Sequence, residues 1–160
     1  MMKFASRFLK TSLCFAMILA FTTFADAQAK TGKTAAKSDK LSSFVKKSGM
    51  PNKDFGDNVW TLDHEGKTIF IGADSDIVVV FMMLGPVSGV KVNGDSMSAL
   101  LRLANELDQV KFIIDDDKML AVRHDSQLRL LDQAAFDDAV LRVINGHQKA
   151  TAKLSPYLIK

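Results

Sequence analysis

The sequence has a single cysteine, Cys14, which lies in an apolar run near the start of the chain. A lone thiol forms no disulfide within its own chain, and it cannot supply a zinc site built from several cysteines. The folded part must therefore be stabilised by the packing of its core. A domain without disulfides can be stable in this way after export as well as inside the cell.

The sequence also lacks recognisable catalytic motifs. Its three histidines, His64, His124 and His147, show no metal-binding spacing. No serine lies in a Gly-x-Ser-x-Gly elbow, and no glycine-rich loop ends in Gly-Lys-Ser/Thr. A calcium-binding loop has a glycine at its bend, and the acidic run 115–117 has none, so we interpret it as a solvated turn. We expect no catalytic residue, metal or cofactor.

Basic charge is scarce in the part of the chain that is expected to fold. The whole chain has a net charge of +3, but residues 1–27 hold three Lys and Arg against one acid, and residues 28–40 hold four Lys against one acid. Residues 41–160 have 14 Lys and Arg against 16 Asp and Glu, which gives −2. Nucleic-acid binding needs a basic face on the folded domain, so we expect no nucleic-acid partner.

Residues 1–27 have the pattern of an export signal. Basic residues at positions 3, 7 and 10 precede the apolar run 11–24, and Ala25–Asp26–Ala27 follows with small residues at the cleavage positions. The run is shorter than the ~20 residues that span a bilayer. We expect cleavage after Ala27, no stable membrane anchor afterwards, and a periplasmic or secreted protein.

The remaining chain divides into a tether and a domain. Residues 28–40 (QAKTGKTAAKSDK) contain no bulky apolar residue and are expected to form a flexible tether. Residues 41–160 are long enough for a single domain with a core of its own.

Hydrophobic periodicity predicts an α+β domain of the order α-β-β-β-α-β-β-α, with helices packed on an antiparallel sheet. The expected helices cover 41–48, about 95–107 with Asp95 or Ser96 as N-cap, and from the N-cap Asp132 towards Lys153. The expected strands cover 59–64, 68–72, 77–84, 111–114 and 119–122, with 52–57 as a loop and a short extended piece at 90–92. Gly146 interrupts the last helix pattern, but the apolar spacing continues beyond it, so we expect that helix to persist.

Residues 100–122 (LLRLANELDQVKFIIDDDKMLAV) carry a family resemblance. They resemble the YbjN-like family, and the resemblance extends over about 41–155. It includes the helix, the Gly-Met-Pro turn and the aromatic strand of 41–60, and the helix that follows Asp132. That family shares the fold of the class I type III secretion chaperones. The resemblance implies a small domain, often dimeric, that binds protein and does not transform a substrate. The export signal distinguishes this chain from chaperones that act in the cytoplasm.

The combined reading is an exported, non-enzymatic module that binds a protein or peptide and could form a homodimer. Its partner groove is expected to include five apolar residues, because methionine-rich surfaces adapt to varied partners: Phe81, Met82, Met83, Met97 and Met119. The alternatives are a carrier of a small molecule or lipid, with an apolar cavity under the sheet, and, third, a hydrolase.

Overall fold

The computed structural model describes residues 33–91, 93–107 and 109–159. The expected signal peptide and its cleavage site lie outside these residues. In chain order the elements are α2 (Lys33–Lys47), β1 (Asn52–Gly56), β2 (Val59–His64), β3 (Lys67–Asp74), β4 (Ile77–Pro86), the short 3-10 turn η2 (Val87–Gly89), α3 (Gly94–Glu106), β5 (Lys111–Ile114), β6 (Met119–Gln127), α4 (Gln133–Leu154) and η3 (Ser155–Tyr157). The α+β prediction is confirmed. Within this part of the chain, no helix is long and apolar enough to cross a membrane.

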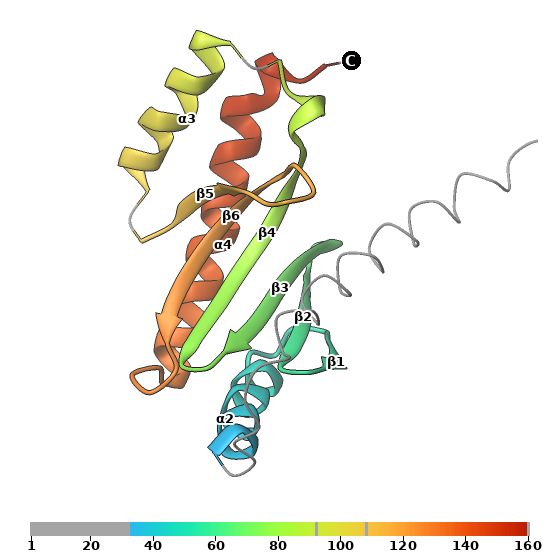
Figure 1. Cartoon of the computed structure of the whole chain (residues 1–160), viewed down its shortest axis with the longest axis vertical. Coiled ribbons are helices and arrows are strands. Elements are labelled where there is room, and N and C mark those ends of the chain that lie inside the picture. Colours follow the sequence, from blue (N-terminus) through green and yellow to red (C-terminus); the bar gives the residue numbers. More distant parts are fainter. Residues whose placement is uncertain (1–32, 92, 108, 160) are drawn as a thin grey trace, which may run out of the picture. The chain divides into compact units, whose positions relative to one another are not determined.

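The strands form one antiparallel sheet in the order β1-β2-β3-β4-β6-β5 (Figure 1). The strands β2, β3 and β4 form an antiparallel meander, and β5 and β6 form a hairpin. The prediction of a loop at 52–57 was wrong, because 52–56 pair with β2 as an edge strand. This strand is almost entirely exposed, and its polar sequence therefore has no apolar alternation that could reveal it.

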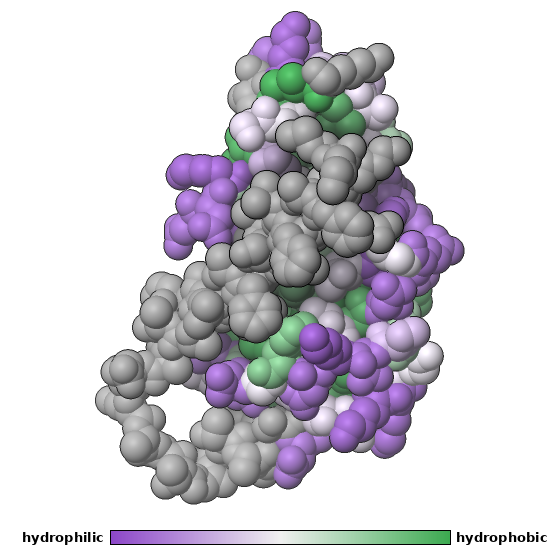
Figure 2. Space-filling model, turned by 90° about the vertical axis from the view of Figure 1, so that its right-hand side faces the viewer, coloured by the Kyte–Doolittle hydropathy of each residue, from purple (hydrophilic) through white to green (hydrophobic). Residues whose placement is uncertain are grey.

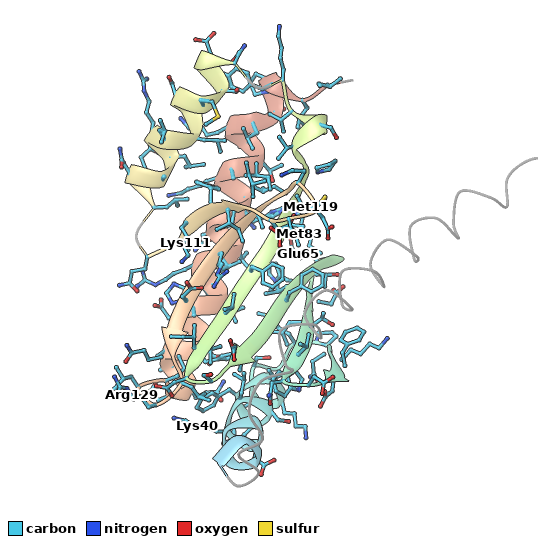
Figure 3. The ribbon with its side chains drawn as sticks, in the orientation of Figure 1. Lys40, Glu65, Met83, Lys111, Met119 and Arg129 are labelled. Carbon is cyan, nitrogen blue, oxygen red and sulfur yellow. The ribbon has the colours of Figure 1, made fainter. Side chains whose placement is uncertain are left out.

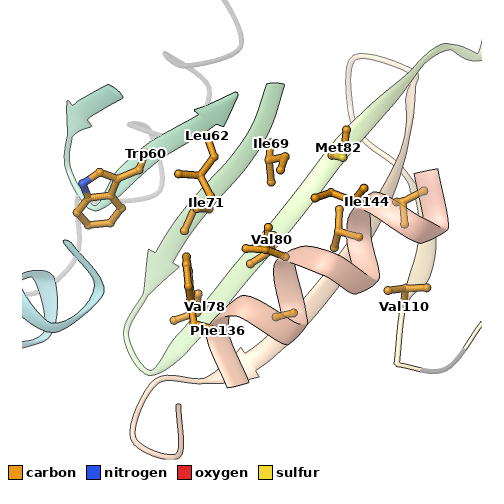
Figure 4. Close-up of a cluster of buried hydrophobic side chains, with 14 of the residues drawn as sticks. Trp60, Leu62, Ile69, Ile71, Val78, Val80, Met82, Val110, Phe136 and Ile144 are labelled. Carbon is orange, nitrogen blue, oxygen red and sulfur yellow. The ribbon is translucent and has the colours of Figure 1, made fainter. Parts of the chain in front are cut away.

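The hydrophobic core lies between one face of the sheet and the helices α2 and α4. Alternate residues of β2, β3 and β4 point into it, including Trp60, Ile71 and Val80, which are all buried (Figure 4). From the helices, Leu41 and Phe136 are fully buried in the same cluster. The opposite face of these strands carries residues of intermediate or full exposure.

The helix α4 runs without a break from the N-cap Asp132, whose carboxylate accepts a hydrogen bond from the Ala135 amide, to Leu154. Its continuation past Gly146 confirms the prediction. Gly146 lies at a close approach to the sheet: a Cβ placed there would be 2.9 Å from Val122 Cγ1 and 3.5 Å from Val110 Cγ2. The glycine therefore allows α4 to lie close to β6.

Two helix starts differ from the predictions. The N-cap of α3 is Asn93, and not Asp95 or Ser96; Asn93 and Ser96 form a reciprocal capping box. The helix α2 begins at Lys33, so it includes part of the segment 28–40 that was expected to be a tether. The Lys40 ammonium donates to the Leu128 carbonyl at 2.9 Å, which ties this helix to the loop before α4.

Candidate protein-binding surface

The face of the sheet opposite α2 and α4 is the candidate surface. We call it the open face. In β2 to β6 its side chains are the odd-numbered ones of β2, β5 and β6, the odd-numbered ones of β4 as far as Met83, and the even-numbered ones of β3. The register places Phe70 opposite Phe81, Phe81 opposite Arg123, and Arg123 opposite Lys111. One row of side chains therefore crosses four strands of this face.

One end of that row is aromatic. The Phe70 and Phe81 rings are stacked, with centroids 5.0 Å apart and an angle of 15° between their planes. Both residues are half-buried, whereas Ile69 and Ile71, beside Phe70 on the other face, are fully buried. A stacked pair that keeps part of its area accessible offers a preformed apolar contact for a partner.

The other end of the row is charged. Asp125 on β6 accepts hydrogen bonds from Arg123, at 2.6 Å, and from the Lys111 ammonium. Burial alone would raise the pKa of Asp125, but the hydrogen bonds from Arg123 and Lys111 outweigh burial and hold the pKa below its usual value. The carboxylate therefore stays ionised at neutral pH, and two cations and one anion flank the aromatic pair.

The structure brings together only some of the five residues predicted for a groove. Phe81 and Met83 are half-buried on the open face, and Met119 begins β6 opposite Pro86, near the end of β4 (Figure 3). Met82 is buried in the core on the other face, so it does not contribute to this surface. Met97 is exposed on α3, which packs beside α4. The role of these residues in binding stays a prediction.

Sequence reasoning missed Phe70, Lys111, Arg123 and Asp125. Phe70 and Lys111 lie in predicted strands, but Arg123 and Asp125 lie beyond the predicted strand 119–122. The pairing of β4 with β6, which aligns Arg123 with Phe81, was not predicted. The side of the molecule shown in Figure 2 has small hydrophobic patches among hydrophilic side chains, so hydropathy alone does not single out a site there.

Two of the three histidines are buried, and His124 lies beside a serine. The Gln109 carbonyl lies 2.6 Å from His124 Nδ1; since a carbonyl only accepts, Nδ1 carries the hydrogen. His124 Nε2 then accepts from Ser126 Oγ at 2.9 Å. A catalytic triad would have a carboxylate where Gln109 supplies a backbone carbonyl. The side chain points into the helix-covered layer, so we read the pair as a link between β6 and the loop after α3.

The described residues give little support to a metal site or to a ligand cavity. Within the described ranges, no three His, Cys, Asp or Glu side chains are grouped so that they could hold a metal ion. A depression of about 360 Å³ on α2 is lined by Asp39, Ser42, Ser43, Lys46 and Lys47. This polar lining differs from the enclosed apolar cavity that a lipid carrier would need.

Comparison with known proteins identifies the fold. No family model and no curated protein sequence matches the chain. Its structure is similar to a chain of the ExoU–SpcU complex of the Pseudomonas aeruginosa type III secretion system, with a TM-score of 0.59 and 20% identity over 71% of this chain and 97% of that one. It is also similar to the Yersinia pestis type III secretion chaperone SycH in complex with a fragment of YscM2, with a TM-score of 0.55 and 11% identity over 71% and 98%.

The chain thus has the fold of the class I type III secretion chaperones, as its sequence resemblance implied. The E. coli protein YbjN matches with a TM-score of 0.49 and 18% identity over 76% of this chain and 95% of that one. The two chaperone-system structures named above are complexes with protein partners.

Proposed function

We propose that this protein is an exported, non-enzymatic module that binds a protein or peptide partner on the open face. The observation that carries the proposal is the half-exposed Phe70–Phe81 stack on a sheet face that lies opposite α2 and α4. The two chaperone-system structures named above are complexes with protein partners, which supports a binding role. The basic, apolar and small-residue pattern of residues 1–27 supports export to the periplasm or the exterior.

The row on the open face indicates what kind of segment fits. The aromatic pair favours apolar side chains, and the neighbouring Lys111 and Arg123, with Asp125 between them, favour polar or acidic ones. A segment in extended conformation presents alternate side chains to one surface, so it can match a row that crosses the strands.

Replacing Phe70 or Phe81 by threonine should abolish partner capture but leave the domain folded. Threonine suits a strand, and the side chains are only half-buried. Loss of an aromatic anchor at an interface costs about 2 kcal/mol or more, which is roughly thirtyfold in affinity. The measurement is affinity capture from the native envelope by the tagged full chain, with quantitative mass spectrometry of what is retained.

The matched control for that experiment is Leu141→Gln, which removes an exposed apolar residue from α4. It should capture the same protein as the natural chain does. Equal capture by all variants would contradict the assignment of the open face, and capture of no protein by the natural chain would contradict the binding function.

We assign homodimer formation to a second surface, the outer side of α3. Met97 and Leu101 are 46% and 64% exposed and lie one helical turn apart on that helix. Two such residues on one face are well suited to meet the same face of another copy. Leu101→Gln should shift the protein from dimer to monomer in sedimentation equilibrium. Monomers of the natural chain at micromolar concentration would contradict this assignment.

A further inference from the structure

His147 connects α4 to the end of β4 through a single hydrogen bond. Its side chain is 8% exposed, and Nε2 lies 3.1 Å from the Met83 carbonyl oxygen. Because the carbonyl only accepts, Nε2 must carry a hydrogen and donate it. Nδ1 is buried and has no hydrogen-bond partner within the described residues. The geometry therefore fixes Nε2 as the donor, and among the described residues Nδ1 faces neither a donor nor an acceptor.

The acceptor carbonyl lies at an irregularity of the sheet. Met83 pairs with Ala121, but the next partner, Leu120, is paired with Gly85, so β4 contains a bulge between Met83 and Gly85. Gly85 has a φ of 139°, a conformation that side chains rarely adopt. A bulge interrupts the ladder locally, and here a side chain from α4 bonds to the strand at that point.

The residues around His147 do not offset a positive charge on its imidazole ring. The residues one turn away on α4 are apolar or uncharged, as are β4 throughout and β6 at 119–122. The charged group that acts on it is Lys67 of β3, which has the same sign. On α3, the titratable side chains are exposed: Asp95, Arg102 and Glu106. On β6, Arg123 and Asp125 lie on the opposite face of the sheet, and His124 bonds to Gln109 and Ser126. On α4, Lys149 and Lys153 are exposed and Arg142 pairs with Asp138, and η3 carries Tyr157.

We propose that His147 is an acid-sensitive latch that holds the end of β4 against α4. The neutral ring donates to Met83 and keeps the bulge in place. Protonation adds an N–H at Nδ1, where none of the described residues offers an acceptor, and places a charge in the apolar layer near Lys67. The latch then opens, and the segment from Met83 to Pro86 loosens. If the proposed function holds, acid also weakens partner binding, because Met83 borders Phe81 on the open face.

The direction of the pH effect follows from linkage. Burial, reinforced by Lys67, lowers the pKa of His147 below its usual 6.5, and the hydrogen bond to Met83 opposes this only in part. The unfolded chain therefore binds more protons than the folded one below pH 6.5. The stabilisation is complete above pH 6.5 and is lost as the pH falls from there towards the folded pKa. One proton changes the unfolding constant by at most about tenfold per pH unit.

The test compares the full chain with His147→Gln, which keeps an N–H donor but cannot be protonated, and with the control His64→Gln on β2. Urea unfolding is measured between pH 7.5 and 5. The natural chain and His64→Gln should lose stability below pH 6.5 more steeply than His147→Gln, by several-fold in the unfolding constant. Parallel pH dependence of all three proteins would overturn the latch.

A second measurement on the natural chain does not depend on the variant folding. Hydrogen exchange at Met83–Pro86, corrected for intrinsic exchange rates, should accelerate several-fold on going from pH 7.5 to 5.5, relative to the centre of β3. Unchanged relative exchange would contradict the latch. Both experiments omit the partner, so they fail or succeed independently of the proposed function. If acid opens the latch but the natural chain captures its partner equally at both pH values, the latch affects stability and not partner binding.

Discussion

Phe136→Ala should destabilise the protein by about 3–5 kcal/mol, the cost of truncating a buried phenylalanine in a well-packed core. Phe136 is fully buried in the first turn of α4. Its ring lies 5.9 Å, centroid to centroid, from that of Phe44 on α2, so its loss affects the packing of two helices on the sheet. The measurement is the free energy of unfolding from urea denaturation at neutral pH.

Leu141→Ala is the control for that prediction. Leu141 lies on the same helix but is 52% exposed, so its truncation should change the free energy of unfolding by less than about 0.5 kcal/mol. A loss below 1 kcal/mol for Phe136→Ala, or equal losses for the two variants, would contradict the placement of the core between α4 and the sheet.

Gly146→Ala should destabilise the protein by about 1–3 kcal/mol, even though alanine is the better helix former. The added Cβ would lie 2.9 Å from Val122 Cγ1, and Val122 is a fully buried, β-branched residue of β6 that cannot move aside easily. Because helix propensity favours alanine by about 1 kcal/mol, a net loss reports the steric clash. Urea denaturation again gives the free energy of unfolding.

The control is Asn145→Ala, which changes an exposed neighbour on the same helix and should be neutral or slightly stabilising. Combining Gly146→Ala with Val122→Ala should recover part of the loss, with a coupling of about 0.5–3 kcal/mol in a double-mutant cycle. A Gly146→Ala protein as stable as the natural chain would show that α4 does not approach β6 closely.

The fold could be predicted wherever a side-chain period was clear. The stripe of α4 and its N-cap Asp132 were predicted correctly, and the helix continues beyond Gly146 as its spacing indicated. The prediction from side-chain periodicity failed at β1, because this exposed polar strand has no apolar face. It also failed at the start of α3, because Asn93 caps that helix from within a segment that appeared to be a loop.

The candidate surface was predictable only in part, because it depends on the pairing of strands. Within the predicted strand 77–84, only Val78, Val80 and Met82 are buried, on the face toward α4. Phe81 and Met83 lie on the open face, whereas Met82, one step along the strand, points to the other face. The stacking of Phe70 on Phe81 follows from register, which local sequence does not encode.

Site-specific photo-crosslinking tests the open face most directly. A photoreactive phenylalanine analogue is placed at Phe81 in one full-length variant and at Leu141, on the outer side of α4, in another, and the cells are irradiated before the adducts are identified. The proposal predicts a defined adduct with another protein at position 81 and none with that protein at position 141. Adducts with that protein at position 141 alone, or only random adducts at both positions, would contradict the role of the open face.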